Sequence, residues 1–183
     1  AGAMGAKITG VDLSSDMSTQ TREAIYQAFL EHQMIFFRDQ DLDAARQVNV
    51  ADILGQPVTY PYLAGVEGNS EAHELIKTPD DEINFGGVWH SDTAYKPEPD
   101  KGTVLYACEL PDAGGDTLYT NTYLAYETLS GGMKVMIDGL IGVNDSEALY
   151  PGGRAGRIAN LSEMKDAYNS SSKPIRSEHP VVR

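Results

Sequence analysis

The stretch that decides the fold of this chain reads Gly86-Gly87-Val88-Trp89-His90-Ser91-Asp92-Thr93-Ala94-Tyr95. Its central feature is the spacing of His90 and Asp92. In an extended strand, residues i and i+2 point to the same face, so His90 Nε2 and a carboxylate oxygen of Asp92 can converge on one point. An imidazole and a carboxylate are two of the three ligands in the 2-His-1-carboxylate triad that holds non-haem Fe(II). The pair is compatible with a metal site, but the spacing alone favours the alternative, a strand histidine hydrogen-bonded to a neighbouring carboxylate.

The surroundings of the pair favour the metal site. A His-x-Asp spacing alone is common in sequences with four histidines. Here a glycine-rich approach, Asn84-Phe85-Gly86-Gly87, comes directly before it and would let backbone come close to a site. About two dozen residues later follows Gly114-Gly115-Asp116-Thr117.

Together these segments resemble the TauD/TfdA family of Fe(II)- and 2-oxoglutarate-dependent dioxygenases. Three further stretches match the family in the same order: Phe36-Phe37-Arg38-Asp39-Gln40, Leu105-Tyr106-Ala107-Cys108-Glu109-Leu110-Pro111 and His179-Pro180-Val181-Val182-Arg183. The resemblance therefore covers essentially the whole chain.

The resemblance implies a mostly β domain with flanking helices (α+β), folded as a double-stranded β-helix, or jelly-roll. It implies that His90 and Asp92 are two iron ligands and that Thr117 binds a carboxylate of 2-oxoglutarate through its hydroxyl. Fe(II), 2-oxoglutarate as co-substrate and O2 are the implied cofactors. The implied reaction is hydroxylation of a small, acidic organic substrate, coupled to decarboxylation of 2-oxoglutarate to succinate.

The family's third iron ligand, a distal histidine followed by an arginine that pairs with 2-oxoglutarate, has no match. His179 and Arg183 fall in a stretch that the family places in an earlier, non-ligating position. We therefore expect residues 1–183 to be a single TauD/TfdA-like domain, incomplete at the C-terminus before the distal His/Arg segment, and inactive or poorly active alone. The alternative is a non-catalytic jelly-roll module that binds a ligand or a partner. A zinc hydrolase would need the same third ligand.

Substrate residues are less clearly marked. Taurine-type enzymes use a His, a Tyr and an Asn at positions that correspond here to Tyr60, Leu63 and Gly86, which argues against taurine. An aryloxyalkanoate, an alkyl sulfate or another small carboxylate stays open. Tyr60, Tyr62 and Tyr95 are candidates to line the substrate pocket, with ordinary packing as the alternative.

Composition narrows the partners and the compartment. The chain has 183 residues, 41% of them hydrophobic, which predicts one folded domain rather than a disordered chain. A net charge of −13 disfavours nucleic acid and anionic membranes as partners. No apolar run approaches the roughly 18 residues of a membrane span. The single cysteine, Cys108, favours a reducing, cytoplasmic setting, and edge strands left uncovered could support a homo-oligomer.

Periodicity and end signals predict the elements. We expect helices over residues 18–32 (capped by Ser18), 42–54, 121–129 (ended by Gly131-Gly132) and 161–168. Short strands are expected over 34–37, 75–77, 88–93, 102–108, 116–120, 141–143 and 180–183, with loops over 56–74 and 150–156. Trp89 and Cys108 are expected to pack inside.

Overall fold

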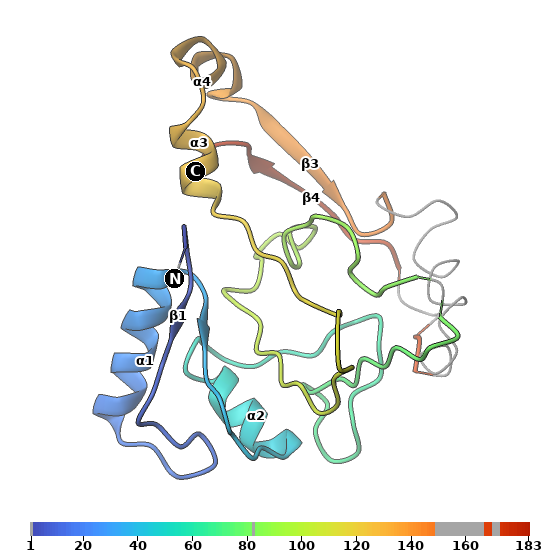
Figure 1. The fold of residues 1–183 in the computed structure, drawn as a ribbon. Helices are drawn as coiled ribbons and strands as arrows, with labels where there is room; N and C mark the ends of the chain where they lie inside the picture. Colours follow the sequence, from blue (N-terminus) through green and yellow to red (C-terminus); the bar gives the residue numbers. More distant parts are fainter. Residues whose placement is uncertain (1, 82, 149–166, 170–172) are drawn as a thin grey trace. The chain divides into compact units, whose positions relative to one another are not determined.

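The computed structural model describes residues 2–81, 83–148, 167–169 and 173–183 (Figure 1). The chain divides into two compact units, which we describe one at a time. Ala1–Gln56 and Val104–Ile137 form the first, and Pro57–Thr103 and Asp138–Arg183 the second. Both helices and strands are present. The predicted loop over 150–156 and all but the end of the predicted helix over 161–168 lie outside the described residues.

The first unit begins with a helix whose ends follow from the sequence. Helix α1 (Thr19–His32) starts where the Ser18 hydroxyl accepts a hydrogen bond from the Thr21 N–H at 3.1 Å. It ends at Gln33, which takes the left-handed conformation, with His32 in the last turn. A cationic side chain at that end suits the helix dipole. The prediction for this helix is confirmed.

A short parallel pair and a second helix complete the N-terminal part. Strand β1 (Ala6–Lys7) pairs with β2 (Ile35–Phe36), so the predicted strand over 34–37 is present but short. Helix α2 (Ala44–Ala51) starts at the side chain of Asp43, which accepts from the Arg46 N–H. The core of the unit is formed by Leu13, Ile25 and Val50, each at most 7% exposed.

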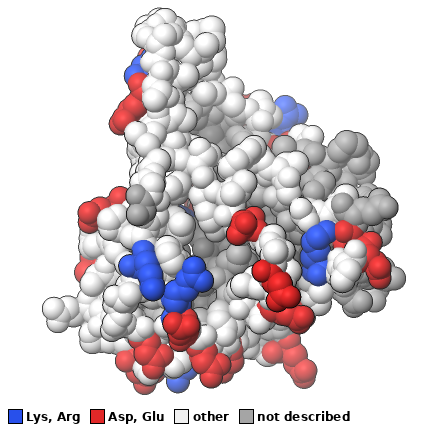
Figure 2. All heavy atoms as spheres, in the orientation of Figure 1, with Lys and Arg blue, Asp and Glu red and all other residues white. Residues whose placement is uncertain are grey.

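The later segment of the first unit returns to this core. Val104 packs against it, and the Val104 carbonyl accepts from Gln47 Nε2 at 3.0 Å. Two short helices follow: α3 (Thr122–Glu127), capped by Asn121 as predicted, and α4 (Gly131–Ile137). Over α3 and α4 the surface in Figure 2 is mostly without charge.

The predicted end of helix α3 before Gly131-Gly132 is confirmed, since α3 ends at Glu127, and a new helix begins at Gly131. Ser130 acts as its N-cap: its hydroxyl accepts from the Met133 N–H at 3.2 Å, and its carbonyl accepts from the Lys134 N–H. A cap of this kind satisfies the free N–H groups of the first turn, so glycines are tolerated there.

The second unit contains an antiparallel pair, β3 (Ile141–Asp145) and β4 (Arg176–Pro180). Ile141 pairs with Pro180 and Asp145 with Arg176. The prediction for β3 is confirmed, whereas the last strand lies four residues earlier than predicted. Pro180 has no N–H to donate to a ladder, and the strand ends at this residue.

Four predicted strands are wrong: residues 75–77, 88–93, 102–108 and 116–120 form no strand in the described part of the chain. A strand needs a neighbouring backbone in register, and not only a suitable local sequence. Local alternation does not say where that neighbour lies. The mostly β prediction accordingly gives way to a mixed helix and strand content. Within the described residues, no helix is long and apolar enough to cross a membrane.

Candidate metal site

His90 and Asp92 meet in the second unit. His90 Nε2 lies 3.0 Å from Asp92 Oδ1. Two ligands that occupy adjacent positions on one metal, with bonds of about 2.1 Å at right angles, have their donor atoms about 3.0 Å apart. The separation therefore fits two neighbouring positions on a metal ion. It also fits a charge-assisted hydrogen bond, which was the alternative for this pair.

The other ring nitrogen decides how His90 is oriented. His90 Nδ1 lies 2.6 Å from the carbonyl oxygen of Val88. A carbonyl can only accept, so Nδ1 carries the proton. In a neutral ring, Nε2 then has a lone pair and faces Asp92. Nε2 and Asp92 Oδ1 are both acceptors in that case, and at 3.0 Å they require a proton or a cation between them. Donation of the second ring N–H to a backbone carbonyl is the usual arrangement in metal-binding histidines.

The second oxygen of Asp92 has its own partner. Thr103 Oγ1 donates to Asp92 Oδ2 at 2.8 Å. Oδ1 is thereby left as the oxygen that faces His90. The carboxylate is held from one side while it presents a single oxygen to the site.

The backbone that brings these groups together is a turn and not the predicted strand. Residues 92–95 turn, and Thr93 has a positive φ of 51°. The prediction that the two side chains converge is met by different means, since a turn places i and i+2 side by side over a short path. Gly86, with φ +69°, lies beside the ring: a Cβ there would be 3.5 Å from His90 Cε1. The expected close approach of glycine backbone to the site is confirmed.

Strand β4 holds the turn that follows Asp92. Ser177 Oγ lies 3.1 Å from the carbonyl oxygens of both Ala94 and Lys96. His179 Nε2 lies 2.9 Å from the Lys96 carbonyl and 2.9 Å from Ser177 Oγ. Because the carbonyl only accepts, Nε2 of His179 carries a proton and donates it, so this nitrogen cannot bind a metal. His179 therefore has the structural role that the sequence favoured.

The pair is accessible, and its third partner is not among the described residues. The side chains of His90 and Asp92 are 36% and 54% exposed. In residues 2–81, 83–148, 167–169 and 173–183 there is no group of three or more His, Cys, Asp or Glu side chains arranged to hold a metal ion. The described part of the chain thus supplies two candidate ligands.

The three candidate tyrosines of the second unit pack largely on one another. Tyr62 is fully buried, and its ring makes edge contacts with Tyr60 at 5.5 Å and with Tyr95 at 6.0 Å. The Tyr62 hydroxyl donates to Ser146 Oγ at 2.8 Å. This geometry favours the packing alternative for Tyr62. Binding of substrate by any of the three stays a prediction.

Thr117 belongs to the first unit, whereas His90 and Asp92 belong to the second. It lies on an exposed segment without regular structure, after Gly114 and Gly115, whose φ angles are +82° and +75°. Its hydroxyl is open to a ligand, and its role with 2-oxoglutarate stays a prediction.

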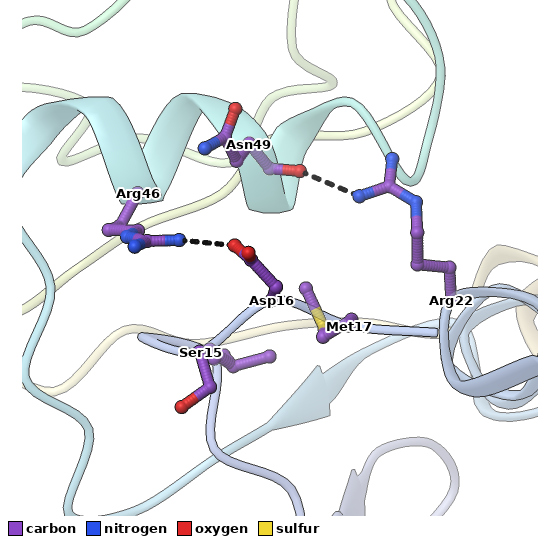
Figure 3. A pocket seen from close by; sticks show the side chains of 7 residues that line it. Ser15, Asp16, Met17, Arg22, Arg46 and Asn49 are labelled. Carbon is purple, nitrogen blue, oxygen red and sulfur yellow. Dashed lines mark hydrogen bonds and ion pairs between the residues drawn. The ribbon is translucent and has the colours of Figure 1, made fainter. Parts of the chain in front are cut away.

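A pocket of about 240 Å³ lies in the first unit and contains none of the predicted site residues. Figure 3 shows its lining: Arg46 points to Asp16, at 3.0 Å, and Arg22 to the Asn49 carbonyl. Arg22 also pairs with Asp52 at 2.6 Å. Both guanidinium groups are thus neutralised by carboxylates of the chain itself, which leaves little attraction for an anion.

Sequence reasoning missed Thr103, the Val88 carbonyl and the role of Ser177. No motif marks Thr103, which lies eleven residues after Asp92. The chain reversal that returns it is held by the Lys96–Asp100 ion pair at 2.7 Å. Two predictions about burial are wrong: Trp89 is 66% exposed and Cys108 is exposed. Both residues were predicted to lie on strands that do not form, so there is no sheet that could give them an inner face.

Comparison with known proteins gives a family, two relatives and a solved structure that the chain is similar to. The family model "Taurine catabolism dioxygenase TauD, TfdA family" matches residues 1–183. The chain is 34% identical over 185 residues to the alpha-ketoglutarate-dependent sulfate ester dioxygenase of Pseudomonas putida, covering 100% of this chain and 60% of the relative. It is 32% identical over 183 residues to the alkylsulfatase of Acinetobacter baylyi, covering 99% and 56%.

Among solved structures, a taurine dioxygenase from Burkholderia xenovorans superposes with a TM-score of 0.67 at 26% identity, covering 98% of this chain and 55% of that one. The chain therefore spans a little over half the length of the relatives it matches.

Proposed function

The chain belongs to the TauD/TfdA family, and from that premise we propose that its protein is an Fe(II)- and 2-oxoglutarate-dependent dioxygenase that hydroxylates a small, acidic organic molecule. The observation that carries the proposal is the 3.0 Å approach of His90 Nε2 to Asp92 Oδ1, with His90 Nδ1 held by the Val88 carbonyl. A donor set of one imidazole and one carboxylate fits the facial triad of non-haem iron.

Each residue has a defined part in this proposal. His90 and Asp92 hold the metal through Nε2 and Oδ1, and the Thr117 hydroxyl donates to a carboxylate of 2-oxoglutarate. Bound Fe(II) supplies the activation of O2 that couples decarboxylation of 2-oxoglutarate to hydroxylation of the substrate. The part of the protein is to fix the positions of ligands, co-substrate and substrate.

The third ligand and the fold belong to the same proposal. A metal held by two side chains alone is held weakly, and the described residues provide two. We place the third ligand, and the arginine that pairs with 2-oxoglutarate, in the portion of the domain that relatives have and residues 1–183 do not span. Residues 1–183 would then be part of one jelly-roll barrel, an assignment supported by the likeness to the taurine dioxygenase structure.

For the substrate we propose an organic sulfate ester. Two relatives above 30% identity are named for sulfate esters, as a sulfate ester dioxygenase and an alkylsulfatase. Hydroxylation of the carbon that carries the sulfate oxygen gives a hemiacetal ester, which eliminates sulfate and leaves an aldehyde. In this reaction one oxygen atom of O2 enters succinate and the other enters the aldehyde.

The test measures succinate and sulfate together. The full-length protein is incubated with Fe(II), 2-oxoglutarate, O2 and a medium-chain alkyl sulfate, and in parallel with taurine and with an aryloxypropionate. We expect succinate and sulfate in equal amounts from the alkyl sulfate. His90→Ala should reduce both products to background, whereas the control His32→Ala should not. Normal turnover by His90→Ala would refute the proposed iron site.

A second candidate function is a non-catalytic jelly-roll module. The observation in its favour is the lack of a third ligand among the described residues. Mass spectrometry and iron analysis of the native protein separate the two candidates. A native mass of 19.8 kDa with no retained iron supports the module. A larger mass with about one iron per chain supports the enzyme.

A further inference from the structure

Thr103 is a residue that neither the motif nor the proposed function assigns. Its hydroxyl donates to Asp92 Oδ2 at 2.8 Å, and this is the carboxylate oxygen that does not face His90. Thr103 Oγ1 and His90 Nε2 thus engage different oxygens of one carboxylate. The bond joins residues eleven positions apart, so it also holds Thr103 next to Asp92 after the chain has reversed direction.

We propose that Thr103 is a positioning residue for the metal site, which makes Asp92 a monodentate ligand through Oδ1; this inference rests on the proposed function. A carboxylate can bind a metal through one oxygen or through both. The Thr103 hydroxyl occupies a lone pair of Oδ2 and fixes the rotation of the carboxylate plane. Bidentate binding would use one more coordination position, and Oδ2 would have to bind the metal while it also accepts from the Thr103 hydroxyl.

The chain between the two residues keeps this arrangement in place. The Asp100 N–H donates to Thr93 Oγ1 at 3.0 Å, and Lys96 pairs with both oxygens of Asp100 at 2.7 and 2.9 Å. The side chains of Lys96 and Asp100 are 18% and 27% exposed. These contacts fix the reversal that returns Thr103 to Asp92. The side chain of Asp92 is half exposed, and water competes for Oδ2 if the hydroxyl is removed.

Thr103→Val removes the hydroxyl and keeps the shape of the side chain, whereas Thr103→Ser keeps the hydroxyl. The affinity of the full-length protein for Co(II) alone is measured by the visible absorption of the bound ion, with the fold of each variant checked by circular dichroism. Loss of a group that orients a metal ligand lowers metal affinity about 10- to 100-fold. Because this site is exposed, we expect about tenfold for Thr103→Val and less than twofold for Thr103→Ser.

The outcomes separate this inference from the proposed function. If Thr103→Val binds Co(II) as wild type does, while His90→Ala does not bind it, the role of Thr103 is refuted and the metal site stands. If Thr103→Ser loses as much affinity as Thr103→Val, the residue acts through packing and the inference is also refuted. If His90→Ala binds Co(II) as wild type does, the proposed metal site fails.

Discussion

Tyr62 gives the sharpest test of how the second unit is built, because its full burial favours a packing role over contact with substrate. Its side chain is fully buried, and its hydroxyl donates to Ser146 Oγ at 2.8 Å, with the Lys173 carbonyl at 3.3 Å. Tyr62→Phe keeps the ring and its edge contacts but leaves these two oxygens without that donor. A net hydrogen bond contributes about 1 kcal/mol, although Ser146 Oγ still accepts from the Ile175 N–H at 3.0 Å.

We therefore expect Tyr62→Phe to lower the free energy of unfolding by about 1–2 kcal/mol. Tyr62→Ala also loses the ring, which costs about 3–5 kcal/mol in a core. In a chain of this size, 1 kcal/mol corresponds to about 2–4 °C in Tm. Urea unfolding followed by far-UV circular dichroism measures the change. The control is Tyr123→Phe, whose side chain is 66% exposed and which should change stability by less than about 0.5 kcal/mol.

One result would contradict the packing role of Tyr62. If Tyr62→Phe unfolds as wild type does but raises KM for the substrate, Tyr62 lies in the substrate site and the packing account of this unit is wrong. Unchanged KM with lowered stability supports the packing account.

Three further predictions concern single groups. Ser177→Ala removes the hydroxyl that lies between two carbonyls of the turn, and should lower the free energy of unfolding in urea by about 1–2 kcal/mol. The control is Ser70→Ala, at an exposed position. Equal stability of the two variants would contradict the role of Ser177. Thr117→Val should raise KM for 2-oxoglutarate about 10- to 100-fold, since hydrogen bonds to charged groups contribute about 1.5–3 kcal/mol, whereas an unchanged KM would remove Thr117 from the co-substrate site. The pKa of Asp12 is held below its usual 3.8 by hydrogen bonds from the Ser14 and Ser15 side chains and the Ser14 N–H. Because the pKa is lower in the folded state, ionised Asp12 stabilises the fold at pH values above the unfolded pKa, and this stabilisation is lost as the pH falls through the folded pKa. NMR should place the titration midpoint of Asp12 below 3.8, and Ser14→Ala should raise that midpoint.

Local chemistry explains why the helices could be predicted from the sequence. The caps at Ser18 and Asn121 use a side chain and an N–H three residues later, so the signal is complete within one turn. The strands could not be located in the same way, because a ladder joins segments far apart. In the segment over 102–108 the exposure alternates in part: Val104 and Tyr106 are half-buried, whereas Leu105 is 62% exposed. What the sequence did not provide was a partner backbone for that segment.

The candidate site, too, has features that the sequence predicted and features that it could not predict. The His90–Asp92 spacing predicted that two donor atoms converge, and they lie 3.0 Å apart. The path was wrong, because a turn and not a strand brings them together. Thr103 and Ser177 could not be found from the sequence, since each contacts the site through a chain reversal or from a distant strand. The proposed metal ligands were marked by residue type and spacing, whereas the residues that support them were marked by neither.

The most direct test of the central claim is an anaerobic titration of the full-length protein with Fe(II) in the presence of 2-oxoglutarate, followed by visible absorption. If His90 and Asp92 hold the iron, wild type should develop the metal-to-ligand charge-transfer band that requires both components, and His90→Ala and Asp92→Ala should not. The control His32→Ala should behave as wild type does. A band of full intensity in His90→Ala would contradict the account.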